Sequence, residues 1–298
     1  MDAPSPTAWR ARLAPILASP QVGELQGIMR RYDAAGGALL ASGLAYSALF
    51  AIVPTIIVLL GLVGVVVADP IDRANVTETL STVAPPLRGL VSASLEQLTT
   101  EAASISIVGL IGFAWGASRF LVALESALGR VLSGDRPRSL VGRNLIGLAS
   151  VVVLLGAVVG GMLFAGLGSF VASFAEAVAP GRTVSSLVEV SFGIAGAAIT
   201  VLALAVVYRF LPAGAPSWRA ILVPSIGVAI VLALITRLFV FLAPRLIGAA
   251  AFLGTLATVF AALAWLGLAF QAILIGAAWI RVRSDREQVL REDSGQEG

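Results

Sequence analysis

The chain has 298 residues, of which 58% are hydrophobic and only 12% are charged, and its mean hydropathy is +0.96. Soluble domains carry about a quarter charged residues, so a soluble protein of this composition would lack the polar groups to cover its surface. Neither Cys nor His occurs, which excludes disulfides, thiolate metal sites and histidine chemistry. The net charge is +3 and all 20 basic residues are Arg. Because the arginines flank apolar segments, they indicate orientation in a membrane rather than nucleic-acid binding.

Residues 1–37 are polar to mixed, and an apolar segment follows from Ala38 to Ala68. The apolar part of a cleaved signal peptide has roughly 7–15 residues, whereas a membrane span needs about 20. We therefore predict an uncleaved first transmembrane helix. Within it, Tyr46 is predicted to place a polar tip in a cavity or against a neighbouring helix, and Pro54 is predicted to kink the helix.

Residues 69–103 form the longest predicted loop outside the cytoplasm, and they carry five acidic residues but only two Arg. Apolar residues recur at every third or fourth position from Leu80 to Leu98, which is typical of an amphipathic helix. Pro85 and Pro86 interrupt this pattern, so we predict two short helices. They are interpreted either as a lid over a cavity or as a connector packed on the outer face of the protein.

Five further apolar segments predict transmembrane helices at about 104–124, 144–168, 187–211, 219–243 and 253–280. Each segment is far longer than the roughly 10 residues of a membrane barrel strand, and none shows the alternation of such a strand. The sequence therefore predicts an all-α protein, a polytopic transmembrane bundle of six helices over residues 38–280. It is preceded by a cytoplasmic segment, residues 1–37, and followed by a cytoplasmic polar tail, residues 281–298.

The arginines in the predicted loops and tails, or flanking a loop at a helix end, are distributed unequally between the two sides of the membrane. The side that holds both termini has fourteen, and the other side has Arg73, Arg88, Arg182 and Arg245. Arginine accumulates in cytoplasmic loops, so both termini are predicted to be cytoplasmic, as an even number of spans requires. We expect the protein to lie in a bacterial inner membrane.

Ionisable side chains within a span are costly unless they face protein, water or a ligand. In the second predicted helix, Arg119 and Glu125 lie six residues apart and on different faces, which disfavours a pair between them. Glu125 is predicted to pair with Arg130 or Arg143 near the cytoplasmic surface. Such a pair would be either a structural contact or part of a gate.

Two polar residues stand out in the last two predicted helices. Arg237 lies about 18 residues into the fifth helix. It either contacts an anion or a lipid headgroup in a cavity, or extends its guanidinium to the outer interface. Gln271, in the sixth helix, either forms an interhelical hydrogen bond or contacts a substrate.

No catalytic constellation is present in the sequence. It contains no phosphate-binding loop, no GxSxG nucleophile motif, no metal-ligand spacing and no paired carboxylates within a span. We therefore expect neither an enzyme, nor a cofactor, nor a bound metal.

The sequence resembles the YihY/virulence factor BrkB family of bacterial inner-membrane proteins over nearly its whole length. Four segments carry the likeness, in the family's order. Their matching residues are Ala45, Tyr46, Leu49 and Pro54; then Trp115, Ser118, Arg119, Ala127 and Leu128; then Pro212, Trp218 and Arg219; and finally Trp265, Leu274, Gly276 and Ala277.

Two positions depart from the family pattern. The family usually has Glu where this chain has Ala278, and commonly has Asn where it has Gly129. The resemblance implies a six-helix inner-membrane protein that moves lipids or other amphiphiles, or that supports envelope integrity. Some family members have carried a ribonuclease label (ribonuclease BN), but a chain without His or clustered acids lacks the residues of a metal-dependent nuclease.

We therefore expect a transporter-like or flippase-like protein that moves or binds an anionic lipid or amphiphile without ATP hydrolysis of its own. Its partners would be membrane lipids and not nucleic acid. The predicted cavity or headgroup contacts are Arg237, Arg119, Gln271 and Tyr46. The alternative is a non-transporting membrane scaffold for envelope integrity that binds partner proteins through its acidic loop and polar tails.

Overall fold

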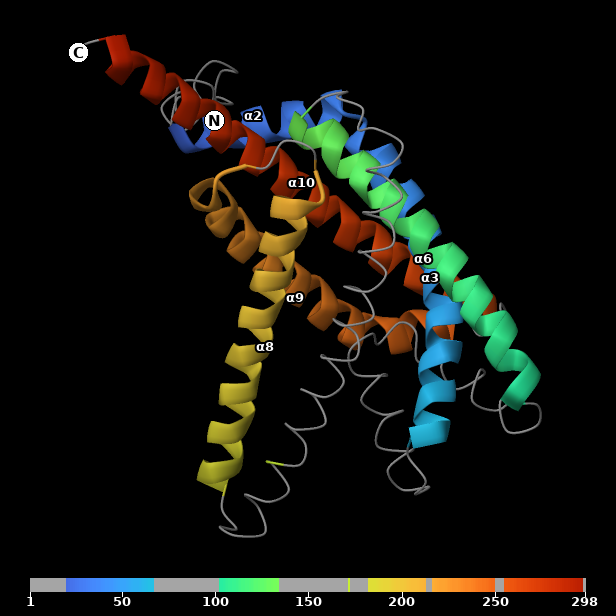
Figure 1. Cartoon of the computed structure of the whole chain (residues 1–298). Helices are drawn as coiled ribbons and strands as arrows, with labels where there is room; N and C mark the ends of the chain where they lie inside the picture. The colour runs from blue at the N-terminus through green and yellow to red at the C-terminus, as the bar shows by residue number, and fades with distance from the viewer. Residues whose placement is uncertain are drawn as a thin grey trace, which may run out of the picture.

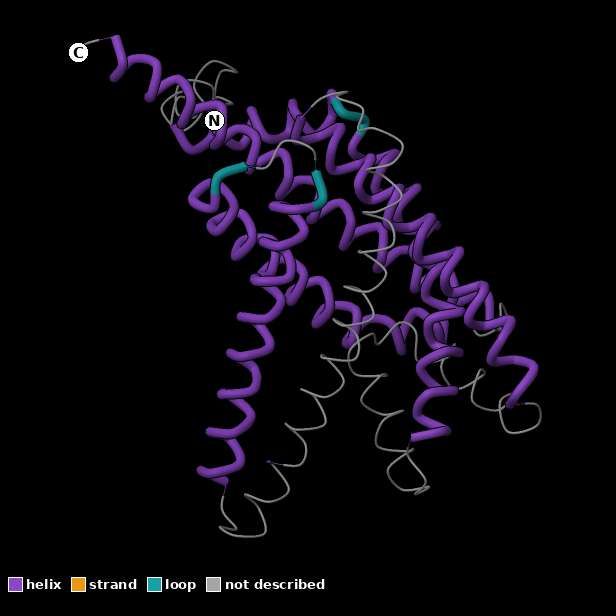
Figure 2. Tube along the Cα trace, viewed as in Figure 1, coloured by secondary structure: helices purple, strands orange, loops and turns teal. Residues whose placement is uncertain are grey.

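A computed structural model of the chain describes residues 20–66, 102–133, 171, 182–212, 216–249 and 255–296. These residues form six long α-helices and no strand, which confirms the all-α prediction (Figures 1 and 2). The predicted third span at 144–168 and nearly all of the predicted loop at 69–103 lie outside the described residues.

The N-terminal part of the described chain is an elbow of two helices, α2 (Pro20–Ala34) and α3 (Gly37–Val66). The axes of the two helices differ in direction by 62°. The break occurs at Gly36, whose φ of 70° is readily adopted only by glycine. The ring of Tyr32 lies so close to Gly37 that a side chain at Gly37 would overlap it. The elbow is therefore a packed corner.

Helix α3 lies along α6 (Ala102–Ser133), which is drawn in green in Figure 1. Small residues allow this close approach, because a Cβ on Gly116 would lie only 3.1 Å from the carbonyl oxygen of Phe50 and 3.2 Å from the Cα of Ala51. Small residues at helix contacts are typical of membrane bundles, where van der Waals packing takes over from the hydrophobic effect. α6 continues to Ser133, beyond the predicted end at about 124.

The C-terminal half contains α8 (Arg182–Phe210), α9 (Trp218–Ala249) and α10 (Thr255–Gln296). α9 begins at Trp218 because the Oγ of Ser217 accepts a hydrogen bond from the backbone N–H of Ala220 at 3.3 Å, the geometry of a helix N-cap. α10 is central among the described helices, since it contacts α2, α3, α6 and α9. Its buried side chains Phe270, Leu274 and Ala277 form part of the core.

Three described helices are long and apolar enough to cross a membrane, over Val190–Phe210, Trp218–Leu242 and Leu256–Val289. A fourth span results if the bent pair α2 and α3 is taken as one. Large apolar side chains are exposed along α8 and α9, among them Ile194, Leu202, Leu234 and Phe241. Lipid is the solvent that suits such surfaces, and the chain is a membrane protein with a helical bundle.

The helix ends that the sequence predicts to be cytoplasmic lie at the same end of the bundle. Figure 1 shows α2, the last turns of α6, the turn between α8 and α9, and the end of α10 together at the top of the view. The first turns of α8 and the last part of α3 lie at the opposite end (Figure 1).

Candidate functional site

A mostly apolar groove lies between α2, α9 and α10 and encloses about 690 Å³. α2 forms one wall of the groove, and α9 and α10 form the others. Its lining residues are Glu24, Leu25 and Ile28 of α2, Gly227, Val228 and Val231 of α9, and Ala272, Ile275, Gly276, Trp279 and Arg283 of α10. The only charged groups among them are Glu24 and Arg283.

The groove follows α10 for three turns, from Ala272 to Arg283. At 1.5 Å per residue this is about 16 Å. Because both charged residues lie toward the polar end of α10, the groove is apolar at one end and charged at the other. Gly227 makes room for the indole of Trp279, since a Cβ on this glycine would lie 2.8 Å from the ring.

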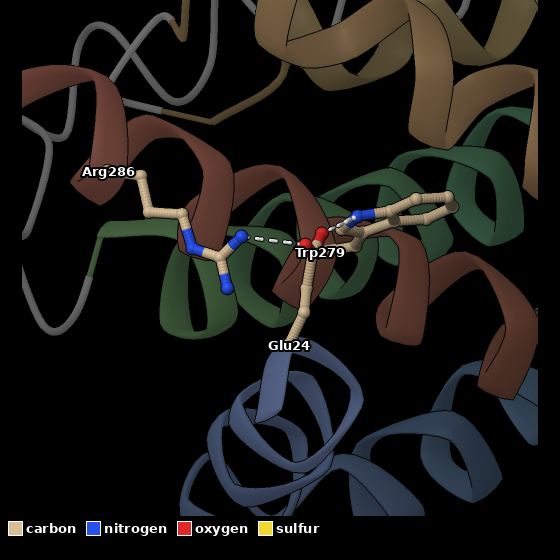
Figure 3. A network of polar contacts seen from close by, with 3 residues as sticks. All are labelled: Glu24, Trp279 and Arg286. Carbon is tan, nitrogen blue, oxygen red and sulfur yellow. Dashed lines mark hydrogen bonds and ion pairs between the residues drawn. The ribbon is translucent and has the colours of Figure 1, made fainter. Parts of the chain in front are cut away.

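The charged end of the groove is organised by the carboxylate of Glu24 (Figure 3). One carboxylate oxygen accepts a hydrogen bond from Nε1 of Trp279 at 2.8 Å, and the other accepts one from Nη1 of Arg286 at 2.7 Å. Glu24 comes from α2 and both donors come from α10, so these contacts attach the two helices to each other. The pair is partly exposed, with 25% of the Glu24 side chain and 53% of the Arg286 side chain accessible to solvent.

Arginines and carboxylates gather at this end of the groove. Arg281 is neutralised by Asp285 of the following turn, with Nε and Oδ1 3.0 Å apart. Within the part of the chain that the structure describes, no carboxylate pairs with Arg283. Three arginines, Arg281, Arg283 and Arg286, stand against three carboxylates, Glu24, Asp285 and Glu287, and the guanidinium of Arg283 is the one among them that no carboxylate contacts in the described part of the chain.

Two hydrogen bonds attach α10 to the end of α8 and to the turn between α8 and α9. The hydroxyl of Tyr208, which is fully buried, donates to the carbonyl oxygen of Ile273 at 2.7 Å. The hydroxyl of Ser217 donates to Oε2 of Glu287 at 3.0 Å. These contacts hold the α9 and α10 walls of the groove in register, while α2 is held by Glu24 and by its packing on α10 and α3.

The four residues predicted as cavity or headgroup contacts do not line this groove. Arg237 is exposed on α9. Arg119 is exposed on α6, with its guanidinium 5.8 Å from the ring centre of Trp115. Tyr46 is 60% exposed on α3. Gln271 is half-buried beside the lining residue Ala272, without lining the groove itself.

The predicted ion pair or gate and the predicted kink stay predictions. Glu125 and Arg130 both lie on the last turns of α6, and Arg143 lies outside the described residues. Pro54 lies within α3, and the light-blue last part of this helix changes direction from its darker first part (Figure 1). Ala278, at the position of the family's usual Glu, is fully buried on α10.

Sequence reasoning did not select the residues that organise the groove. The signal for α2 was available, because Leu25, Ile28, Met29 and Tyr32 recur at the spacing of an amphipathic helix. Trp279 also had a signal, since tryptophan at the end of an apolar segment is typical of a membrane interface. Nothing in the sequence indicates that Glu24 and Trp279, which are 255 residues apart, are in contact.

Comparison with known proteins places the chain in a family of membrane proteins. A family model described as Virulence factor BrkB matches residues 28–298. UPF0761 membrane proteins from Pseudomonas aeruginosa strains LESB58 and UCBPP-PA14 are each 26% identical over 241 residues, which is 80% of this chain and 57% of the relative. The chain thus spans little more than half the length of these relatives. No solved structure matches.

Proposed function

Because this chain belongs to the Virulence factor BrkB family of membrane proteins, we propose that it binds anionic lipids or other anionic amphiphiles in the groove between α2, α9 and α10. It moves them as a transporter or flippase, without ATP hydrolysis of its own. It is a multi-pass protein of a bacterial inner membrane, with the charged end of the groove at the cytoplasmic surface.

The shape and chemistry of the groove support this proposal. The apolar end is lined by side chains such as Ile28, Val231 and Ile275, which suit a hydrocarbon chain. Its length of about 16 Å matches one leaflet, which is about half of the roughly 30 Å hydrocarbon core. The guanidinium of Arg283, which lines the groove and forms no ion pair among the described residues, suits an anionic headgroup, because guanidinium groups bind carboxylates and phosphates through paired hydrogen bonds.

The arrangement of the helix ends supports the orientation. The ends that carry most of the arginines lie at one end of the bundle, together with the charged end of the groove (Figure 1). Arginine-rich loops stay on the cytoplasmic side, so the groove receives lipids from the inner leaflet. The chain has no His or Cys, and we propose that it works through binding and conformational change rather than as an enzyme.

Reconstitution into liposomes tests the proposal. Vesicles contain fluorescent phosphatidylglycerol, and an impermeant quencher reports how much of it crosses between leaflets. We expect transfer above that of protein-free vesicles, and a reduced rate for Arg283→Gln. Arg237→Gln is the matched control, because Arg237 is a cation on the neighbouring wall helix α9 outside the groove. Wild-type transfer equal to that of protein-free vesicles would overturn the proposal of transport.

A non-transporting scaffold is the alternative. It is favoured by the polar end of α10, which extends beyond the other described helices (Figure 1). Two results together would favour this alternative. The wild-type protein would transfer no lipid, and the last turns of α10 would be protected from proteolysis only when a partner protein is present.

A further inference from the structure

The cationic end of the groove is already filled by an anion of the protein itself. The carboxylate of Glu24 occupies the place between Trp279 and Arg286 (Figure 3). Under the proposed function, the headgroup of a bound amphiphile needs the same cations. A ligand with its chain in the apolar part of the groove therefore meets Glu24 at the charged end.

We propose that Glu24 is an internal competitor for the anionic headgroup and sets the charge specificity of the groove. On binding, the headgroup takes over Arg286 together with Arg283, and the carboxylate of Glu24 withdraws. This inference rests on the proposed function and adds to it a specificity-determining residue and a reason for α2 to move.

The charges at the groove support an exchange of this kind. With Glu24 in place, Arg283 forms no ion pair among the described residues, and its guanidinium attracts an anion to the groove. Once the headgroup is bound, a remaining Glu24 carboxylate would repel it at close range. A neutral or zwitterionic headgroup gains no comparable attraction from the arginines, so it leaves the bond between Glu24 and Arg286 intact.

The exchange has a structural consequence for α2. The two bonds of Glu24 are polar contacts between α2 and α10. Glu24 lies in the first turns of α2, whereas the packed corner of Tyr32 on Gly37 lies at the other end. Loss of the Glu24 contacts therefore weakens the attachment of the first turns of α2 to α10, which then depends on side-chain packing, and leaves the elbow in place.

Binding measurements on a charge-neutral variant test the inference. Purified protein in a neutral detergent is titrated with short-chain phosphatidylglycerol, with phosphatidylcholine of the same chain length and with inorganic phosphate, and bound lipid is counted by native mass spectrometry. In Glu24→Gln the amide oxygen still accepts from Trp279, but the competing charge is gone. A partly exposed ion pair is worth up to about 1 kcal/mol, so we expect phosphatidylglycerol to bind about two- to fivefold more tightly.

Three comparisons make this result specific. Asp33→Asn is the matched control, because Asp33 is an exposed acid on the same helix outside the groove, and we expect it to bind as the wild type does. Phosphatidylcholine affinity should be the same in wild type and Glu24→Gln. Inorganic phosphate should not displace phosphatidylglycerol at the lipid concentrations used, because phosphate lacks an acyl chain. Displacement of phosphatidylglycerol by phosphate at the same concentration would show an anion site without lipid selectivity and overturn the inference.

The outcomes separate this inference from the function on which it rests. Unchanged or weaker phosphatidylglycerol binding by Glu24→Gln, with weaker binding by Arg283→Gln, would overturn the competitor role and leave the groove as a lipid site. Wild-type protein that does not distinguish phosphatidylglycerol from phosphatidylcholine, with Arg283→Gln unchanged, would overturn the anionic lipid site itself.

A second measurement does not depend on the folding of Glu24→Gln. The chain has no Cys, so spin labels can be attached through Gln26→Cys on α2 and Gln288→Cys on α10, both at exposed positions. Phosphatidylglycerol should lengthen or broaden the distribution of distances between the labels, and phosphatidylcholine should leave it unchanged. A distribution that phosphatidylglycerol leaves unchanged would overturn the release of α2.

Discussion

At the scale of single residues, Gly276 of α10 packs tightly against side chains of α8 and α9. A Cβ at this position would overlap Val228 of α9 and lie 2.6 Å from the hydroxyl oxygen of Tyr208 of α8. Tyr208 is fully buried and bonded to α10, so it has little room to give way. Close packing of this kind is the main attraction between helices in lipid.

We therefore predict that Gly276→Ala destabilises the protein by about 1–3 kcal/mol, the usual cost of overpacking. Gly267→Ala, on the same helix, is the matched control, because a Cβ there meets no atom within 4 Å. Thermal unfolding in detergent, followed by tryptophan fluorescence, should show a lower midpoint for Gly276→Ala and an unchanged or higher midpoint for Gly267→Ala. Equal midpoints would contradict the tight packing.

The arginines show how far residue-level prediction reaches. Its position within an apolar segment predicts Arg237 as a cavity contact, whereas the structure places it exposed on α9 and outside the groove. Arg283 lies among other charged residues after the apolar segment and gave no such signal, yet it lines the groove. Depth in a span can be read from hydropathy. Whether a side chain faces the groove or the outside of the bundle depends on how helices from distant parts of the chain pack.

At the scale of elements, α10 combines an apolar part and a polar part in one helix of 42 residues. Hydropathy predicts a helix end at about 280, because the apolar residues end there. The helix continues to Gln296, since the Arg, Glu, Gln and Leu residues that follow are good helix formers. The same reasoning applies to α6. Polarity thus predicts where a helix leaves the lipid, but not where it ends.

A proline in the polar part of α10 should separate its two parts. Val289 is 55% exposed, and Val289→Pro removes a backbone hydrogen bond and clashes with the preceding turn, at a cost of about 3 kcal/mol. We expect faster hydrogen–deuterium exchange at residues 285–296 and unchanged exchange at residues 262–280. Val289→Ala keeps the backbone donor and should exchange like the wild type. Faster exchange along the whole of α10 would contradict this prediction.

At the scale of the whole molecule, the positions of the arginines predict which end of the bundle faces the cytoplasm. Arg219 and Arg245 lie near the two ends of α9. They are separated by about 39 Å at 1.5 Å per residue, which exceeds the roughly 30 Å hydrocarbon core. Because α9 is apolar enough to span, the two residues should lie on opposite sides of the membrane.

Cysteine labelling checks this orientation, because the chain contains no native Cys. An impermeant thiol reagent should label Arg219→Cys and Gln288→Cys in inverted membrane vesicles, and Arg245→Cys in cells whose outer membrane has been made permeable. Labelling of Arg219→Cys and Arg245→Cys from the same side would contradict the spanning of α9. The reverse pattern would contradict the cytoplasmic position of the groove's charged end.

The length of α10 has a mechanical consequence. A helix of 42 residues is about 63 Å long, roughly twice the thickness of the hydrocarbon core. α10 contacts α2, α3, α6 and α9, and its polar part is bonded through Arg286 to Glu24 and through Glu287 to Ser217. Because the helix is continuous, a tilt of its apolar part carries the polar part with it and strains these two bonds. A conformational change within the membrane can thus be detected as a movement of the last turns of α10 in the aqueous phase.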